Sequence, residues 1–449
     1  MGENTTTIEK MISKLLEEKK FATLRDVMNT MAPADIAIIF DSLPAEKMPV
    51  LFRILSKELA AEAFVEMDAD LQESLIRVFS DSELKAVVDE LYVDDAVDII
   101  EEMPANVVKR ILSQTDRDMR KMINEILKYP DDSAGSIMTT EYVSFKPDMT
   151  VTEAIKNIRR SGVDKETIYT CYVTEKDKKL IGIVTVRSLL MADDDDEISK
   201  IMEENVISVN TLEDKEDVAN KLAKYDFLAL PVVDRENRLV GIVTVDDAID
   251  VIREEATEDI EKMAAITPTD KPYLKTTVFE LWRARIPWLL LLMLSSTFTG
   301  IIITHFESAL AATSVLAAYI PMLMGTGGNS GSQSSVAIIR GLSLNEIEFS
   351  DIFRVQWKEI RVSVLCGLTL AGANFLKLVF LDNVGVAVSL VVSIALAVTV
   401  FTAKFVGCSL PILSKKIGFD PAVMASPFIT TIVDAISLLI YFTFASMLL

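Results

Sequence analysis

Histidine and cysteine are scarce in this 449-residue sequence. His305 is the only histidine, which excludes most zinc, haem and histidine-based catalytic sites. Cys171, Cys366 and Cys408 lie far apart, so no disulfide framework or paired-cysteine metal site is predicted, and a reducing compartment suits them. No P-loop, activated nucleophile or pair of catalytic carboxylates is recognisable. The sequence therefore does not predict an enzyme.

Long apolar runs are missing from the first 270 residues, which are strongly acidic. They contain 58 acidic and 33 basic side chains, for a net charge of −25, whereas residues 271–449 carry +3. An acidic surface repels nucleic acid and anionic lipid headgroups, so we expect cations and not nucleic acid as partners. The N-terminus, MGENTTTIEKMISK, has no apolar signal region, so export of the acidic part is not expected.

Five apolar segments follow Pro268, each of about the 20 residues that a helix needs to cross the bilayer. They cover residues 286–306, 311–339, 362–381, 386–413 and 422–449. Basic residues flank the first span and fill the loops after the second and fourth: Lys271, Lys275, Arg283, Arg285, Arg340, Arg354, Lys358, Arg361, Lys415 and Lys416. By the positive-inside rule, we expect a multi-pass protein of the cell (inner) membrane with a cytoplasmic head and an external C-terminus.

The second span contains eleven consecutive small or polar residues, from Gly325 to Ser335. One interpretation is close helix packing, since Gly and Ser let helix backbones approach. The interpretation we favour is a cation path, in which Gly and the preceding Pro321 loosen the helix and expose backbone carbonyls beside the amide oxygens. The candidate ion ligands are Gly325, Gly328, Asn329 and Gln333.

Asp434 stands near the middle of the last span. A carboxylate in lipid is costly, so an intramembrane aspartate normally faces a cavity or a partner. It could pair with Lys404 of the fourth span or cap a neighbouring helix, but a cation path is the better hypothesis. Lys377, the other lysine within a span, is expected to reach the outer interface.

Residues 21–130 contain a weak repeat of short amphipathic helices. The stretch from Asp35 to Ala45 recurs 60 residues later as Asp95 to Ala105, with a degenerate copy at residues 64–69 between them. Apolar residues at spacings of three and four, with Pro near helix starts, predict a helical superhelix.

A sharper repeat follows, of strands and helices. Residues 180–186, LIGIVTV, are echoed by residues 239–245, LVGIVTV, and each run leads into a helix. This repeat resembles a tandem pair of cystathionine-β-synthase-type (CBS) modules, some of which bind adenosine nucleotides through a T-x-x-D motif. The second copy keeps Thr244 and Asp247, whereas the first has Thr185 and Ser188. The candidate nucleotide-binding residues are Arg187, Phe227 and Thr244.

The next helix, residues 249–263, carries apolar side chains on one face and acidic side chains on the other. Like charges one turn apart destabilise a helix by roughly 0.2–0.5 kcal/mol per pair, and only Arg253 and Lys262 offset them. A solvated acidic face is the simplest interpretation. Because the helix ends at Thr267–Pro268, just before the first span, whatever binds its carboxylates could also act on the membrane domain.

Together these elements resemble the MgtE family of magnesium channels and transporters. The most specific matches are residues 319–333, YIPMLMGTGGNSGSQ, and residues 255–260, EATEDI. The resemblance implies a multidomain membrane protein: an all-α superhelical N-domain (1–130), an α/β tandem CBS pair (131–247), a connecting plug helix (248–270) and a five-helix transmembrane domain (271–449). It also implies a homodimer, with the second and fifth spans lining a pore on the two-fold axis.

The resemblance further implies metal sites. Asp434 would bind hydrated Mg²⁺ at the pore centre. Regulatory Mg²⁺ would bind acidic residues of the N-domain, the CBS pair and the plug: Asp94, Asp98, Asp214, Glu216, Asp226, Asp247, Asp250, Glu255, Glu258 and Asp259. Relatives often carry another acid one turn after Glu307, where this chain has Ala311. Mg²⁺ is thus the expected ion and regulator, and ATP a possible additional ligand.

These observations predict a Mg²⁺-selective uptake channel that closes when cytosolic Mg²⁺ neutralises the acidic head. A coupled divalent-cation transporter or exchanger would use the same residues, with Asp434 as a possible proton carrier. A nucleotide-sensing membrane enzyme or scaffold is the alternative from another class. Selectivity among Mg²⁺, Mn²⁺, Co²⁺ and Ca²⁺ does not follow from the sequence.

Overall fold

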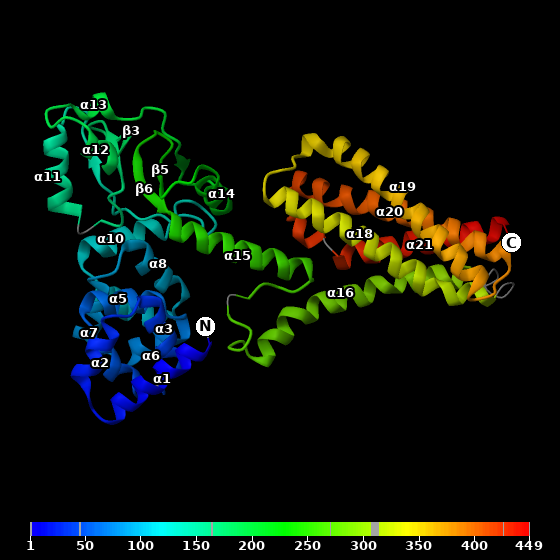
Figure 1. Ribbon diagram of the computed structural model, residues 1–449, viewed down its shortest axis with the longest axis horizontal. Coiled ribbons are helices and arrows are strands. Elements are labelled where there is room, and N and C mark those ends of the chain that lie inside the picture. Colours follow the sequence, from blue (N-terminus) through cyan, green and yellow to red (C-terminus); the bar gives the residue numbers. More distant parts are fainter. Residues whose placement is uncertain are drawn as a thin grey trace. The chain divides into compact units, whose positions relative to one another are not determined.

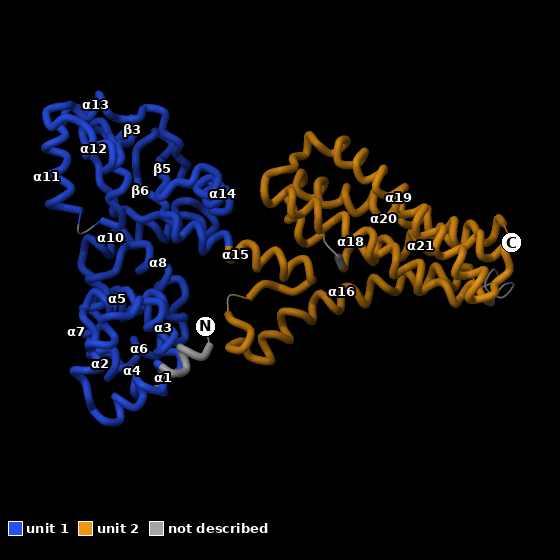
Figure 2. Tube along the Cα trace, viewed as in Figure 1, with its two compact units in different colours: residues 1–252 blue, residues 253–449 orange. Residues whose placement is uncertain are grey.

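The computed structural model describes residues 2–44, 46–162, 165–269, 271–306, 314–424 and 426–448. The chain forms two compact units, residues 1–252 and residues 253–449, which we call the head unit and the membrane unit (Figure 2). The predicted difference at Ala311 lies outside the described residues.

In the residues that the structure describes, the head unit begins with ten helices (Figure 1). They are α1 (Gly2–Glu17), α2 (Phe21–Met28), α3 (Pro33–Ser42), α4 (Met48–Phe52), α5 (Lys57–Val65), α6 (Ala69–Val78), α7 (Asp81–Val88), α8 (Val93–Glu102), α9 (Ala105–Gln114) and α10 (Arg117–Ile126). The two clear copies of the predicted repeat form α3 and α8, and the degenerate copy covers the end of α5. The predicted all-α N-domain is therefore confirmed.

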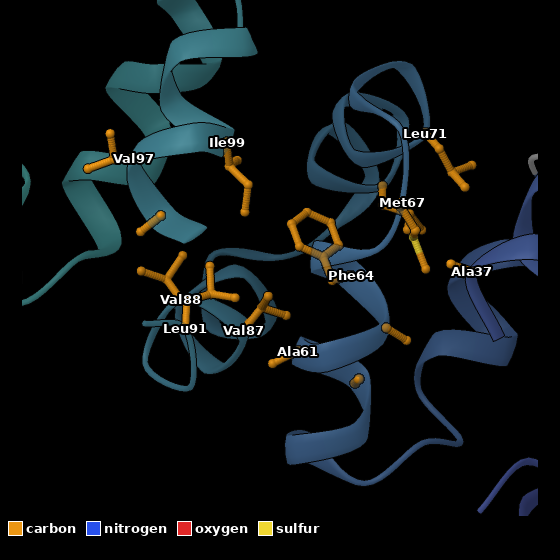
Figure 3. Packing of buried hydrophobic residues seen from close by; sticks show 14 of the residues in the cluster. Ala37, Ala61, Phe64, Met67, Leu71, Val87, Val88, Leu91, Val97 and Ile99 are labelled. Atoms are coloured by element: carbon orange, nitrogen blue, oxygen red, sulfur yellow. The ribbon is translucent and has the colours of Figure 1, made fainter. Parts of the chain in front are cut away.

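The core of this helical part is built from stacked helices. Phe64 of α5 lies 6.2 Å from Phe52 of α4, and Phe52 lies 4.8 Å from Phe79, measured between ring centroids. Figure 3 shows Phe64 with Ala61 of the same helix, Met67 just after that helix, and Val87 of α7. Burying these apolar faces on one another supplies the stability that helices of about ten residues cannot supply alone.

Two three-stranded sheets follow, and in each a helix lies between the first and second strands. The first contains β1 (Ser144–Phe145), β2 (Thr170–Thr174) and β3 (Leu180–Thr185), and the second β4 (Val209–Asn210), β5 (Ala229–Val233) and β6 (Leu239–Thr244). In each, the first two strands are parallel and the last two antiparallel. Their helices are α11 (Val151–Ser161), α12 (Val186–Met191), α13 (Ile198–Ile201) and α14 (Lys215–Tyr225). The predicted tandem α/β repeat is confirmed.

The glycine of each repeated strand, Gly182 or Gly241, leaves room for a segment of the other module to pack against that strand. Thr139 exchanges backbone hydrogen bonds with Ile242 of β6, and Glu203 does the same with Ile183 of β3. A Cβ at Gly241 would lie 2.7 Å from the Met138 sulfur, and one at Gly182 would lie 2.8 Å from the Met202 sulfur. The segment before each sheet therefore packs on the sheet of the other module.

Strand β6 leads directly into α15 (Val245–Met263), the predicted connecting helix. Thr244 Oγ1, at the end of the strand, donates a hydrogen bond to Asp247 Oδ2 at 2.5 Å. Residues 245–252 belong to the head unit and residues 253–263 to the membrane unit. One continuous helix therefore carries acidic side chains of both units.

The membrane unit contains five long helices in its described residues. They are α16 (Val278–His305), α18 (Ile320–Ser343), α19 (Ile352–Phe380), α20 (Val386–Lys416) and α21 (Ser426–Leu448), with short 3₁₀ segments η2 (Ser314–Tyr319), η3 (Phe349–Asp351) and η4 (Pro421–Met424). In the described residues, four helices are long and apolar enough to cross a membrane by composition: α16, α19, α20 and α21. Helix α18 has the length, but its small polar run lowers its hydropathy.

Helix α18 contradicts the expectation that Gly residues and Pro321 loosen the second span and expose its backbone carbonyls. It is uninterrupted through Gly325–Ser335, so its backbone is not loosened and its carbonyls are not released. Pro321 lies in the first turn, where its missing N–H breaks no helical hydrogen bond. Close packing holds the glycines in place: a Cβ at Gly331 would lie 2.8 Å from Ile429 of α21, and one at Gly407 of α20 would lie 2.3 Å from the Gly331 oxygen. The packing interpretation is therefore correct for part of the segment.

Candidate functional site

One face of α18 is polar and exposed. Gly325, Asn329 and Gln333 lie on it at helical spacings of four. Nothing lies within 4 Å of a Cβ built at Gly325. Gly328 is different, because it is buried and its Cβ would lie 3.0 Å from Thr430 of α21. Three of the four predicted pore ligands of this helix thus share one open face, whereas Gly328 meets α21.

Asp434 on α21 lies beside this face. Gly331 meets Ile429, and Gly327 meets Val433 and Ser437, so α18 and α21 run in opposite directions. Asp434 is one turn after Thr430, the neighbour of Gly328, and is therefore level with the turn of α18 that contains Gly325. Its carboxylate is half-buried and makes no hydrogen bond or ion pair with any part of the chain that the structure describes.

Lys404 does not pair with Asp434. Its ammonium donates to the Ser334 hydroxyl oxygen of α18 at 3.3 Å, and Ser334 donates to Glu359 Oε2 of α19 at 2.7 Å. The alternative of an Asp434–Lys404 pair is therefore wrong. Sequence analysis identified neither Ser334 nor Glu359 as a partner of Lys404. The three residues lie on different helices, so no short-range sequence pattern connects them.

Acidic side chains gather in the head unit where α8 approaches the start of α15. Asp94, only 6% exposed, has a buried Oδ1 without a hydrogen-bond partner among the described residues. Burial and the Asp247 carboxylate raise the pKa of Asp94 well above its usual value. The same causes raise the pKa of Asp95 and of Asp98 to about 7.

The CBS pair contributes to the same acidic group. Burial and the Asp95 charge raise the pKa of Glu166 to about 8. Burial also raises the pKa of Asp247 to about 6, although its hydrogen bond from Thr244 works against this. Glu141 accepts hydrogen bonds from the Thr139 hydroxyl at 2.7 Å and from the Val93 N–H at 3.3 Å. Sequence analysis found Asp94, Asp98 and Asp247 but missed Asp95, Glu141 and Glu166.

This acidic group should make the isolated head sensitive to pH in the absence of Mg²⁺. A carboxyl whose folded pKa is raised stabilises the fold below its unfolded pKa of about 4, and that stability is lost as pH rises through the folded pKa. Raising the pH from 5 to 8 should therefore lower the melting temperature by about 5 °C or more. Differential scanning calorimetry in EDTA, and again with millimolar Mg²⁺, would measure the drop.

Asp94→Asn should reduce this drop, because it removes a buried charge, whereas exposed Glu62→Gln should leave it unchanged. Saturating Mg²⁺ should abolish the drop if ions compensate the carboxylates. Equal melting temperatures at pH 5 and pH 8 without Mg²⁺ would contradict the electrostatic role of the group.

The second half of α15 meets the membrane unit. Lys262 forms an ion pair with Asp420 Oδ2 at 2.7 Å and another with Glu258. Although burial lowers it, these hydrogen bonds raise the pKa of Lys262. Met263 packs with Ile339 and Ala422. Asp420, in the loop before η4, is thus another residue that sequence analysis missed, although an acid near Lys415 and Lys416 was a usable signal.

The remaining predicted regulatory residues are distributed along the chain. Asp259 is hydrogen-bonded by Ser343, and burial together with the nearby Asp420 raises its pKa. Asp214 caps α14 by accepting from the Glu216 N–H at 2.9 Å, and Asp226 ends that helix in the left-handed conformation. Asp250 is exposed, whereas Glu255 and Glu258 are half-buried on α15. No cluster of three or more His, Cys, Asp or Glu side chains close enough to hold an ion occurs in the described ranges.

A hollow of about 570 Å³ lies on the CBS pair. Arg187 and Phe227 line it with Tyr169, whereas Thr244 is buried elsewhere and bonded to Asp247. The aromatic walls and Arg187 suit a base and a phosphate. At the ribose position of the motif, Ser188 replaces the aspartate and its hydroxyl pairs with the Thr185 hydroxyl at 2.8 Å, although Asp226 also lines the hollow. The residues therefore fit a nucleotide only in part, and no regulatory step is derived from ATP.

Comparisons with known proteins match this arrangement. Residues 320–444 match the MgtE divalent cation transporter model, residues 31–132 the MgtE intracellular N domain, and residues 134–195 and 198–254 CBS domains. The chain is 38% identical over 442 residues to the magnesium transporter MgtE of Thermus thermophilus, covering 98% of both chains, and 33% identical to that of Bacillus subtilis, covering 96% of this chain and 95% of the relative.

Solved structures agree for the head. The cytosolic domain of the Mg²⁺ channel MgtE in complex with ATP covers 54% of this chain and 99% of its own, with 35% identity and a TM-score of 0.52. The soluble part of a magnesium transporter covers 56% and 99%, with 33% identity and a TM-score of 0.53. These likenesses, with the helices of the membrane unit, confirm the predicted family and fold class. The chain is a membrane protein that belongs to the MgtE family of divalent cation transporters.

Proposed function

We propose that this chain forms a Mg²⁺ channel for uptake that closes when cytosolic Mg²⁺ binds its acidic domains. The observation that carries the proposal is Asp434, a half-buried carboxylate without a partner among the described residues, level with the open polar turn at Gly325. An unpaired intramembrane carboxylate is retained at a cost of several kcal/mol, which favours a functional role. Magnesium keeps most of its waters and is bound through one or two carboxylates, so Asp434 suits a hydrated ion.

The channel is proposed to be a homodimer. One chain offers only an open face, formed by Gly325, Asn329 and Gln333, and a second copy would close it into a path with two Asp434 carboxylates. The apolar stripe of α15 supports this, because Ile249 is 59% and Ile260 63% exposed in the single chain. The proposed orientation keeps the head in the cytoplasm and the C-terminus outside, since the basic loops favour it.

Gating is proposed to act through α15. Its first half carries Asp247 into the acidic group around Asp94, and its second half carries Lys262 to Asp420. At low Mg²⁺ the carboxylates repel one another and the head loosens, which would shift α15 and open the pore. At high Mg²⁺, ions shared between carboxylates favour the compact, closed form. Several weak sites that bind the closed form better give a steep response.

Ion flux into liposomes containing the purified full chain tests the proposal. We expect Mg²⁺ uptake with a reversal potential set by Mg²⁺ alone, and inhibition when Mg²⁺ is added on the side of the head. A reversal potential that follows Na⁺ or protons would favour the coupled transporter. Absence of any divalent flux from correctly inserted protein would refute conduction.

The open face of α18 provides a sharper test. Gly325→Leu and Asn329→Leu place apolar bulk on that face without changing charge, so each should reduce Mg²⁺ flux by at least about tenfold. Gly372→Leu on α19 is the matched control, because nothing lies within 4 Å of its Cβ and it is remote from α18 in sequence. Flux should be measured together with Mg²⁺-dependent protease protection of the head, which should remain normal. Full conduction in both α18 variants would favour a pore elsewhere.

A further inference from the structure

Three helices of the membrane unit meet at a buried charged group. Lys404 of α20 is 5% exposed and Ser334 of α18 is 3% exposed. The Lys404 ammonium donates to the Ser334 hydroxyl oxygen at 3.3 Å, and that hydroxyl donates to Glu359 Oε2 of α19 at 2.7 Å. Glu359 is half-buried, and the Ser334 hydroxyl links its carboxylate to the Lys404 ammonium. We call Lys404, Ser334 and Glu359 the buried triad.

The triad is distinct from the polar face proposed to conduct. Ser334 follows Gln333 in sequence but is buried, whereas Gln333 is exposed. Close packing also surrounds the triad, since a Cβ at Gly407, one turn from Lys404, would lie 2.3 Å from the Gly331 oxygen. A long ion path through this packed position is therefore not available without separating α18 from α20.

Oxygen atoms near the triad resemble the ligands of a small cation. Ser334 supplies a hydroxyl and Glu359 a carboxylate. Carboxylate and other oxygen ligands suit hard cations. A half-buried carboxylate is more stable with a positive charge beside it, and Lys404 supplies that charge through Ser334.

We propose that Lys404 is a tethered cation, which permanently supplies the positive charge that a free monovalent ion such as Na⁺ would otherwise supply to Glu359 and Ser334. Because the ammonium is covalently attached, it cannot be released to either side of the membrane. A gradient of Na⁺ can therefore do no work at this position. The triad thus accounts for conduction without Na⁺ coupling in a helix bundle that contains a half-buried acid, and in this respect it rests on the proposed channel function.

Removing the tether should create a cation site. In the full chain, Lys404→Ala leaves the Glu359 carboxylate and Ser334 in place without their positive charge. Na⁺ at about ten times its dissociation constant should then raise the melting temperature of this variant by about 2–4 °C. The comparison is NaCl against choline chloride at equal ionic strength, with wild type expected to melt at the same temperature in both.

Two variants serve as controls. The double variant Lys404→Ala with Glu359→Gln carries neither charge of the triad and should show no Na⁺ effect. Lys377→Ala removes an exposed lysine that pairs with Asp382 at 2.9 Å, and it should also be indifferent to Na⁺. Recovery of folded Lys404→Ala only when Na⁺ is present would support the proposal equally well.

Several results would overturn the proposal. One is an equal Na⁺ effect in Lys404→Ala and in the double variant. Another is the absence of any Na⁺ effect in folded Lys404→Ala. A third is a Lys404→Ala chain that fails to fold in both salts while the double variant folds. A wild-type Mg²⁺ flux that requires Na⁺ would also overturn it. Absence of all flux would instead count against the channel, because the melting experiment does not depend on transport.

Discussion

Asp434→Ala should reduce Mg²⁺ flux by at least about 100-fold while the protein still folds and inserts. Two charges of the ion at about 5 Å from a carboxylate interact by several kcal/mol at an effective dielectric constant of about 20, and 2.7 kcal/mol already corresponds to about 100-fold. Asp434→Asn should have nearly the same effect, because it keeps the size of the side chain and removes only the charge. Stopped-flow uptake into liposomes, normalised to inserted protein, measures the loss.

Stability distinguishes this loss from misfolding. The Asp434 carboxylate has no partner among the described residues, so both variants should melt at or above the wild-type temperature. Asp351→Ala is a suitable control, because it removes an acid of the same unit that pairs with Arg354 at 3.0 Å near the start of α19. That variant should conduct normally. Selective wild-type currents in Asp434→Ala would remove this carboxylate from the mechanism.

The parts of the fold that sequence predicted are those with a short-range signal. Strands β3 and β6 follow from two β-branched runs with the same turn residues, and α3 and α8 follow from a repeat with helical spacing. The limits of the membrane helices were less accurate. Helix α19 starts at Ile352, ten residues before the predicted span, because Arg354 and Lys358 are compatible with a helix that extends beyond the hydrocarbon.

The candidate site was predicted only where one residue carries the signal. Asp434 stands alone in an apolar run, so its position was informative. The buried triad was missed because its members lie 25 and 70 residues from Ser334, and no periodicity connects them. Gly328 was grouped with Gly325 by composition, whereas helix geometry turns it toward Thr430. Tertiary packing decides which member of a uniform run faces a neighbour.

The two ends of α15 lie in different electrostatic surroundings. In the head unit, Asp247 meets other carboxylates, and burial raises the pKa of Asp98 to about 7. In the membrane unit, Lys262 pairs with both Glu258 and Asp420. The carboxylates at the head end of α15 therefore face other carboxylates, whereas Lys262 provides a positive charge at the membrane end. We expect Mg²⁺ to act more strongly at the head end.

Replacing Asp247, Asp250, Glu255, Glu258 and Asp259 together by Ala should leave the channel open at high cytosolic Mg²⁺. Two effects of opposite sign compete. Loss of shared ions favours the open pore, whereas loss of repulsion favours the closed pore at low Mg²⁺. Repulsion between exposed carboxylates is screened over about 8 Å at physiological ionic strength, and ions bound among buried carboxylates are screened much less. Loss of the shared ions should therefore dominate.

Patch-clamp recording with 0.1 and 10 mM Mg²⁺ on the side of the head measures this effect. Wild-type current should fall at least about tenfold between the two concentrations, and the quintuple variant should show less than a twofold change. The pair Asp247→Ala with Asp250→Ala should produce most of the effect, because Lys262 still holds Asp420 at the other end of α15. Glu254→Ala, on the same helix, should behave as wild type. A quintuple variant whose current still falls as in wild type would show that Mg²⁺ is sensed outside α15, since no acid of the proposed set would remain on that helix to bind it.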